Sequence, residues 1–130
     1  MSAAPFHAHI YFTAEQRTMA EALREAFLLQ MGSGSAFPLL FVGEMMDRAV
    51  GPHSLPQFEI HFLERSIEGV VTLIEASGLR ALVHPLTDDD IADHTISARW
   101  IGAPVDLDLT VLDPPGLNKG VSRFGKSDFA

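Results

Sequence analysis

A strict alternation of apolar and polar residues over positions 6–12 most constrains what this chain can fold into. Side chains on a β-strand alternate between its two sides, so this pattern predicts a strand with two different faces. The apolar face is made by Ala8, Ile10 and Phe12, and the polar face by His7, His9 and Tyr11. Helices are expected to cover the first face. The second face brings two imidazoles together, and histidine is both a common metal ligand and the usual acid or base near neutral pH.

The segments up to residue 85 predict two helices and three further strands. A capping-box pattern precedes apolar residues at helical spacing, which predicts a first helix from about Glu15 to Met31. Weak alternation predicts an irregular strand within 39–50, and clean alternation predicts a strand over 57–63. Apolar residues from Ile67 onward predict a second helix that ends near Gly78, followed by a short strand at 81–85.

The last part of the chain predicts an appended helix and strand. Thr87 and the acidic residues after it are typical of a helix start, and the helix is expected to run to about Trp100. Alternation over 105–112 predicts a final strand. We expect residues 1–112 to form one domain and residues 113–130 to be a loosely ordered tail, because the tail is polar and contains glycine.

The element order predicts an α+β fold with the ferredoxin-like β-α-β-β-α-β arrangement, in which an antiparallel sheet carries helices on one face. The other face is expected to be open. In this arrangement the first strand lies between the third and the fourth. The topology would therefore bring five polar side chains of the open face toward a common surface: His7, His9, Glu59, His61 and His84.

Composition restricts the classes of function. The chain has 130 residues and no cysteine, so any metal must be held by nitrogen and oxygen ligands. A net charge of -8 without a basic stripe argues against nucleic acid as a partner. No apolar run approaches the roughly 20 residues of a membrane span, so we expect no membrane partner. The N-terminus has no basic segment followed by an apolar one, and we expect a cytoplasmic protein.

The strand spacing is compatible with a metal site. Residues two apart on a strand lie roughly 6.5–7 Å apart at their Cα atoms, so His7 and His9 can bind one ion, although either could instead be a core-edge or solvent-facing histidine. Glu59 and His84 on neighbouring strands strengthen the metal hypothesis. Two histidines and one carboxylate are the ligands of non-haem Fe(II) oxygenases, which keep positions open for substrate and dioxygen. Zn²⁺ is a second metal that such a site accepts.

Other polar residues each have two possible roles. His53 in a proline-stiffened loop and His94 on the predicted third helix could enter a pocket from its rim as acid or base, or lie on the surface. His61 could belong to the same polar face, but its neighbour Phe62 and its place near the strand end favour a packing or solvent role. Tyr11 could form a pocket wall or serve as structural filling. The open sheet face predicts a homodimer, because a partner subunit or the segment after Asp113 would have to cover it.

Several ordered motifs together resemble the DOPA 4,5-dioxygenase family. They are Phe6-His7-Ala8-His9-Ile10-Tyr11-Phe12, Gly51-Pro52-His53-Ser54-Leu55-Pro56-Gln57-Phe58-Glu59, Val83-His84-Pro85-Leu86-Thr87, Asp93-His94-Thr95 and Trp100-Ile101-Gly102. The resemblance extends from about residue 6 to residue 109. It implies an extradiol enzyme that opens the ring of DOPA or a related catechol with O2.

The resemblance also implies roles for individual residues. His9 and His84, with Glu59 or His7, would be metal ligands. His53 and His94 would be acid-base or substrate-contacting residues. The alternative to this enzyme is a metal-free ferredoxin-like dimer that binds a small aromatic ligand on its open sheet face.

Overall fold

The computed structural model describes residues 5–32, 34–87 and 89–113, so the predicted tail lies outside the described residues from position 114 onward. The strands of this part are β1 (Pro5–Tyr11), β2 (Leu39–Val42), β3 (Gln57–Leu63), β4 (Arg80–Pro85) and β5 (Arg99–Ile101). The α-helices are α1 (Arg17–Leu28), α2 (Ile67–Ser77) and the single turn α3 (Asp90–Asp93). Short 3-10 turns are η1 (Ala14–Gln16), η2 (Glu64–Ser66) and η3 (Leu109–Val111).

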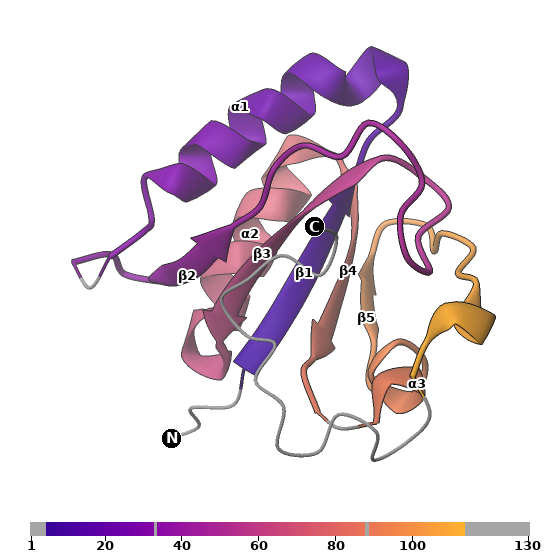
Figure 1. Cartoon of the computed structure of the whole chain (residues 1–130). Helices are drawn as coiled ribbons and strands as arrows, with labels where there is room; N and C mark the ends of the chain where they lie inside the picture. Colours follow the sequence, from indigo (N-terminus) through magenta and orange to yellow (C-terminus); the bar gives the residue numbers. More distant parts are fainter. Residues whose placement is uncertain (1–4, 33, 88, 114–130) are drawn as a thin grey trace.

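The strands form one antiparallel sheet in the order β2-β3-β1-β4-β5 (Figure 1). The first strand is central and lies between β3 and β4, which confirms the predicted ferredoxin-like arrangement. The register places His7 opposite His61 on β3 and opposite His84 on β4. It also places His9 opposite Glu59. The sheet therefore collects side chains that are up to 77 positions apart in the sequence.

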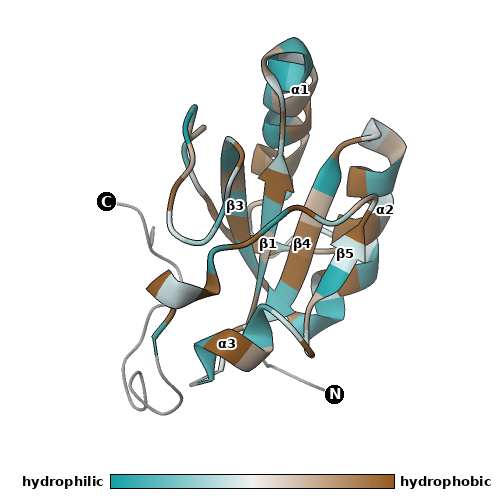
Figure 2. Cartoon of the chain, turned by 90° about the vertical axis from the view of Figure 1, so that its right-hand side faces the viewer, coloured by the Kyte–Doolittle hydropathy of each residue, from teal (hydrophilic) through white to brown (hydrophobic). Residues whose placement is uncertain are grey.

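Helices α1 and α2 cover one face of this sheet, and the main core lies between the two layers (Figure 1). Its largest fully buried side chains are Ile10, Phe12, Phe27, Leu39, Phe58, Ile60, Phe62, Ile74 and Leu79. Figure 2 shows hydrophobic residues along the middle of β4 and hydrophilic ones at its ends. Burial of each such side chain contributes about 1.5–3 kcal/mol, so this layer stabilises the scaffold under the polar face.

The second face is covered by the chain itself, which corrects the expectation of an open face. A smaller core cluster lies there, in which Tyr11, Leu82 and Val105 are buried. Two loops cross this face and are tied together: the Ser54 hydroxyl donates to the Asp106 carbonyl at 2.7 Å, and the backbone N–H of Asp108 donates to the carbonyl of Pro52 at 2.8 Å.

The predicted third helix is wrong beyond its first turn. Asp89, not Thr87, caps α3, and Thr87 donates through its N–H and its hydroxyl to the Asp93 carboxylate. The next residues are poor helix formers, and residues 99–101 instead pair with β4. Sheet pairing therefore supplies the hydrogen bonds that a helix continued to Trp100 would have supplied.

The predicted strand at 105–112 and the end of the first helix also differ from the structure. Asp108 accepts from the N–H of Thr110, and this local turn leads into η3 instead of a strand. The first helix begins as the turn η1 and ends at Leu28, three residues before Met31. None of the helices within the described residues is both long and apolar enough to cross a membrane.

Candidate active site

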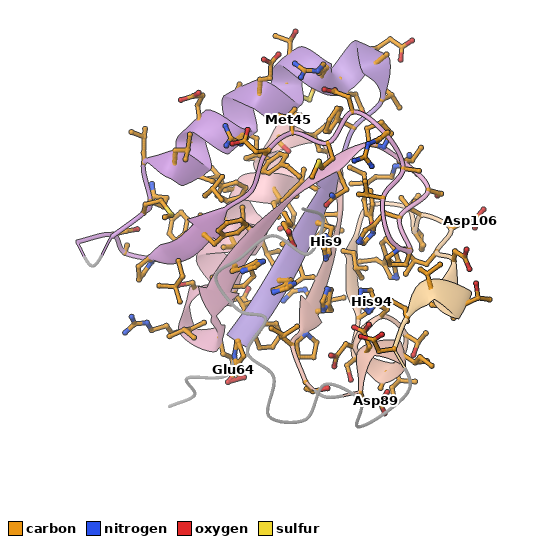
Figure 3. All side chains as sticks on the ribbon, viewed as in Figure 1. His9, Met45, Glu64, Asp89, His94 and Asp106 are labelled. Atoms are coloured by element: carbon orange, nitrogen blue, oxygen red, sulfur yellow. The ribbon has the colours of Figure 1, made fainter. Side chains whose placement is uncertain are left out.

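All six histidines of the chain are buried, with exposed fractions of 7 % or less. Strands contribute four of them, because residues on the polar faces of β1, β3 and β4 point to the same side of the sheet. The other two come from the loop before β3 and from the end of α3. Figure 3 shows that His9 and His94 lie on the same side of the molecule, although they are distant in sequence. Such burial of a polar residue type requires specific partners.

His9 and His84 form the centre of this group. Their Nε2 atoms lie 3.0 Å apart. The Nδ1 atom of His84 donates to the carbonyl of Pro85 at 2.7 Å, and Nδ1 of His9 lies 3.0 Å from the Oε1 atom of Gln57. Protons on both Nδ1 atoms leave both Nε2 lone pairs facing the same point. Two metal bonds of about 2.1 Å at a right angle would place the nitrogens about 3.0 Å apart, so the pair has the separation of two ligands of one ion.

His7 extends this pair into a group of three. Ligand atoms of His7, His9 and His84 all lie within 4.8 Å of one another. A second group joins His7 to Glu59 and His61, with 3.3 Å between Nε2 of His61 and the Glu59 carboxylate. His7 stacks on His61 with ring centroids 3.8 Å apart. Glu59 therefore lies on the β3 side of His7, with His61, and not in the group that contains His9 and His84.

His53 and His94 line the same cavity, from the loop before β3 and from the end of α3. With His9 they make a third group of ligand atoms within 4.8 Å. His94 donates from Nδ1 to the carbonyl of Asp90 at 2.7 Å, and the Asp90 carboxylate lies 3.6 Å from the same nitrogen. Nδ1 of His53 lies 2.7 Å from the hydroxyl of Tyr11. Both rings are thus held by a neighbour on the Nδ1 side.

A cavity of about 450 Å³ opens in front of these histidines. This volume is within the range of small-molecule sites, which is about 300–1,000 Å³. Its lining is His7, His9, Gly51, Pro52, His53, His84, Leu86, Asp90, His94, Val111, Leu112 and Asp113. Five of the six histidines line it, together with apolar and acidic residues. A flat molecule of the size of a substituted benzene ring fits such a space.

Burial keeps the imidazoles of His9 and His53 neutral. It holds the pKa of His9 well below its ordinary value, and the surrounding histidines, His53 first, lower that pKa further. Burial also lowers the pKa of His53 to about 3, with a smaller contribution from His94. The pKa of Tyr11 is raised, again mainly by burial, so its hydroxyl stays protonated. Neutral imidazoles are the form that binds metal ions.

The donor set fits a divalent transition metal. Imidazole nitrogens suit Fe, Zn, Cu and Ni, and oxygen acceptors behind the coordinating rings are typical of metal-binding histidines. His84 has the carbonyl of Pro85 in that place and His9 has the Gln57 amide. An ion held by His7, His9 and His84 would keep open positions toward the cavity.

Sequence reasoning missed two residues that the structure places against the proposed site histidines. His7, His9, His84, His53 and His94 all line the cavity, whereas Glu59 is not among its lining residues. The sequence motifs give Gln57 no role, although its alternation with Glu59 and His61 places it on the polar face of the predicted strand. Asp90 was interpreted as an ordinary acid at a helix start, and no sequence signal distinguishes it from its acidic neighbours.

Comparison with known proteins agrees with the motifs. A model of the Dopa 4,5-dioxygenase family matches residues 6–111. The chain belongs to this family. It is 36 % identical over 114 residues to the DOPA 4,5-dioxygenase of Amanita muscaria, which covers 82 % of this chain and 49 % of that protein. An uncharacterized 21.2 kDa protein of Botryotinia fuckeliana is 30 % identical over 117 residues, which covers 82 % of this chain and 62 % of the relative.

The chain thus spans about half to three-fifths of the length of these curated relatives. A solved structure is similar over a larger share. It is the crystal structure of a candidate dioxygenase from Nostoc punctiforme, with 33 % identity, a TM-score of 0.71, and coverage of 84 % of this chain and 90 % of that one. The family predicted from the motifs is therefore confirmed, and the ferredoxin-like fold is shared with this neighbour.

Proposed function

We propose that this protein is a dioxygenase that cleaves the ring of a catechol with O2, in the extradiol manner, and that it requires a non-haem metal, most simply Fe(II). The observation that supports it best is the cavity in front of His9 and His84, whose Nε2 atoms converge at 3.0 Å. Membership of the Dopa 4,5-dioxygenase family supports the same reaction class. DOPA or a related catechol is the proposed substrate class.

The proposed ligands are His7, His9 and His84, and Glu59 is the remaining candidate from the sequence. When bound there, the metal supplies the positive charge that favours a catecholate and the redox chemistry that O2 requires. The protein positions the ring in the cavity and excludes water from the reacting atoms. Buried neutral imidazoles next to this space can accept a proton from a catechol hydroxyl or return one to the product.

His94 and His53 have different roles toward the substrate in this proposal, one as a base and one as a hydrogen-bond donor. His94 has its Nδ1 proton directed at the carbonyl of Asp90, so its Nε2 atom is the one that accepts the proton of the substrate. The protonated Tyr11 hydroxyl donates to Nδ1 of His53, which leaves the proton of this neutral ring on Nε2. His53 then donates a hydrogen bond to an oxygen of the substrate. Two histidines with opposite tautomers thus supply one base and one donor.

Oxygen consumption tests the proposal directly. The protein is freed of metal, loaded anaerobically with Fe(II), and mixed with air-saturated solutions of DOPA, caffeate, dopamine or 4-methylcatechol. We expect oxygen uptake that tracks a yellow semialdehyde-type product, at a rate above that of Fe(II) alone. The His84→Ala variant, treated in the same way, is the control. Absence of uptake above the Fe(II) control for every catechol would contradict the enzyme and favour the metal-free binding module.

The homodimer and the cytoplasmic location remain predictions from the sequence. The premise of the homodimer has changed, because the described residues 50–56 and 105–108 already cross the second face of the sheet. A partner subunit would therefore add to this cover and not replace it.

A further inference from the structure

The side chain of Gln57 lies behind His9 at the start of β3. It is fully buried, and Gln57 is paired with Tyr11 across the sheet. Its Oε1 atom is 3.0 Å from the Nδ1 atom of His9, while His9 presents Nε2 to His84 and the cavity. Gln57 is not among the cavity-lining residues. Any effect of Gln57 on a bound ion must therefore pass through the His9 ring.

An acceptor at Nδ1 decides which nitrogen of His9 carries the proton. A neutral imidazole has one N–H and one lone pair, so a proton held on Nδ1 leaves the lone pair on Nε2. The carbonyl of Pro85 makes the same choice for His84. A backbone carbonyl can only accept, whereas an amide side chain can also donate. Of these two acceptors, Gln57 is thus the one whose hydrogen-bonding role can change.

The amide of Gln57 is not explained by stability of the fold. Its Nε2 atom is buried and has no hydrogen-bond acceptor within the described residues. A buried donor without an acceptor destabilises a folded protein, and an apolar side chain of similar size avoids this loss. Elsewhere on this second face the chain uses apolar side chains, such as Leu82 and Val105. A glutamine at this position is unfavourable for packing, but it provides His9 with a hydrogen-bond acceptor.

We propose that Gln57 is a positioning residue that orients His9 for metal binding, by accepting the Nδ1 proton and directing the Nε2 lone pair at the ion. This inference rests on the proposed function, since it assumes that His9 is a ligand. It predicts that affinity for metal and stability of the metal-free fold respond in opposite directions to changes at position 57. A residue with only a structural role would change the stability of the fold and leave the affinity for metal unchanged.

Two variants at this position separate the roles. Gln57→Leu removes the acceptor and the unsatisfied N–H together, so we expect a 10–100-fold loss of affinity for Zn²⁺ with an unchanged or higher Tm of the metal-free protein. Gln57→Glu keeps an acceptor and adds a buried charge, so we expect affinity equal to or above that of the parent and a lower Tm. Affinity is measured with Zn²⁺ against a chromophoric chelator, and Tm by circular dichroism in EDTA.

Phe58→Leu is the matched control. Phe58 is the next residue on β3, is fully buried in the main core cluster on the helix-covered face, and is not among the cavity-lining residues. This variant should lower Tm and leave Zn²⁺ affinity unchanged, which shows that loss of stability alone does not weaken binding.

Each outcome has a separate meaning. Parent protein that binds neither Zn²⁺ nor Fe(II) overturns the metal-dependent function and this inference together. Parent protein that binds Zn²⁺ while Gln57→Leu binds it equally well overturns the inference alone. Loss of affinity in Gln57→Glu also overturns it, because Gln57 would then be acting as a donor to His9.

Discussion

His7 has a histidine on each side of it in the sheet, His84 on β4 and His61 on β3. Both neighbours are buried to the same degree, yet only His84 lines the cavity. The two groups of potential ligands that contain His7 therefore differ in their position relative to the substrate space. An ion that takes part in a reaction must be reached by the substrate, which favours the group with His9 and His84.

Replacement of these two neighbours distinguishes the groups. We expect His84→Ala to lose bound metal, because it removes one of the two converging Nε2 atoms. His61→Ala should keep about one ion per chain, because its imidazole faces Glu59. Elemental analysis of the two variants after Fe(II) loading and gel filtration measures the difference. Metal retained in His84→Ala and lost in His61→Ala would place the ion between His7, Glu59 and His61 instead.

At the scale of elements, α2 packs so closely that one of its residues has to be glycine. A Cβ atom built on Gly69 would overlap the ring of Phe37, which precedes β2 and is packed against the core. We expect Gly69→Ala to destabilise the protein by about 1–3 kcal/mol, despite the higher helix propensity of alanine. Urea unfolding gives the free energy of unfolding.

Gly34→Ala is the control for this change. Its added Cβ would meet no atom within 4 Å, so its free energy of unfolding should stay within about 0.5 kcal/mol of the parent. Equal stability of the Gly69→Ala variant and the parent would mean that α2 can move away from Phe37, and that the layer of helices is less tightly set than the structure indicates.

Elements with a strong local pattern were predictable from the sequence, and elements that depend on distant partners were not. The alternation in β1 and β3 gave the correct faces, and the apolar spacing of α1 and α2 gave their existence. The strand at residues 99–101 was not predictable, because its conformation is set by pairing with β4, which no local pattern reveals. The same division applies to the site: histidines on strands were found by alternation, whereas Asp90 depends on how α3 lies over the cavity.

At the scale of the whole molecule, the burial of His9 and His53 couples stability to pH. A histidine whose pKa is lowered in the fold binds fewer protons there than in the unfolded chain. Its contribution to stability is complete above the ordinary value of 6.5 and is lost as pH falls toward the folded value, which is about 3 for His53. Below pH 6.5, each such histidine lowers the free energy of unfolding by up to about 1.4 kcal/mol per pH unit.

We therefore expect the free energy of unfolding of the metal-free protein to fall steeply between pH 6.5 and pH 5. Urea unfolding in the presence of a chelator, at several pH values, measures this slope. His53→Asn replaces the buried imidazole by a group that does not titrate and keeps a polar atom near the Tyr11 hydroxyl, so its slope should be shallower. Asp47→Asn is the control, because it removes an exposed carboxylate whose lowered pKa, held down by Arg17, affects stability only at lower pH. A flat profile in the parent from pH 7 to pH 5 would show that His9 and His53 are protonated as readily in the fold as in the unfolded chain. The neutral, metal-binding form of these two imidazoles would then have no electrostatic basis.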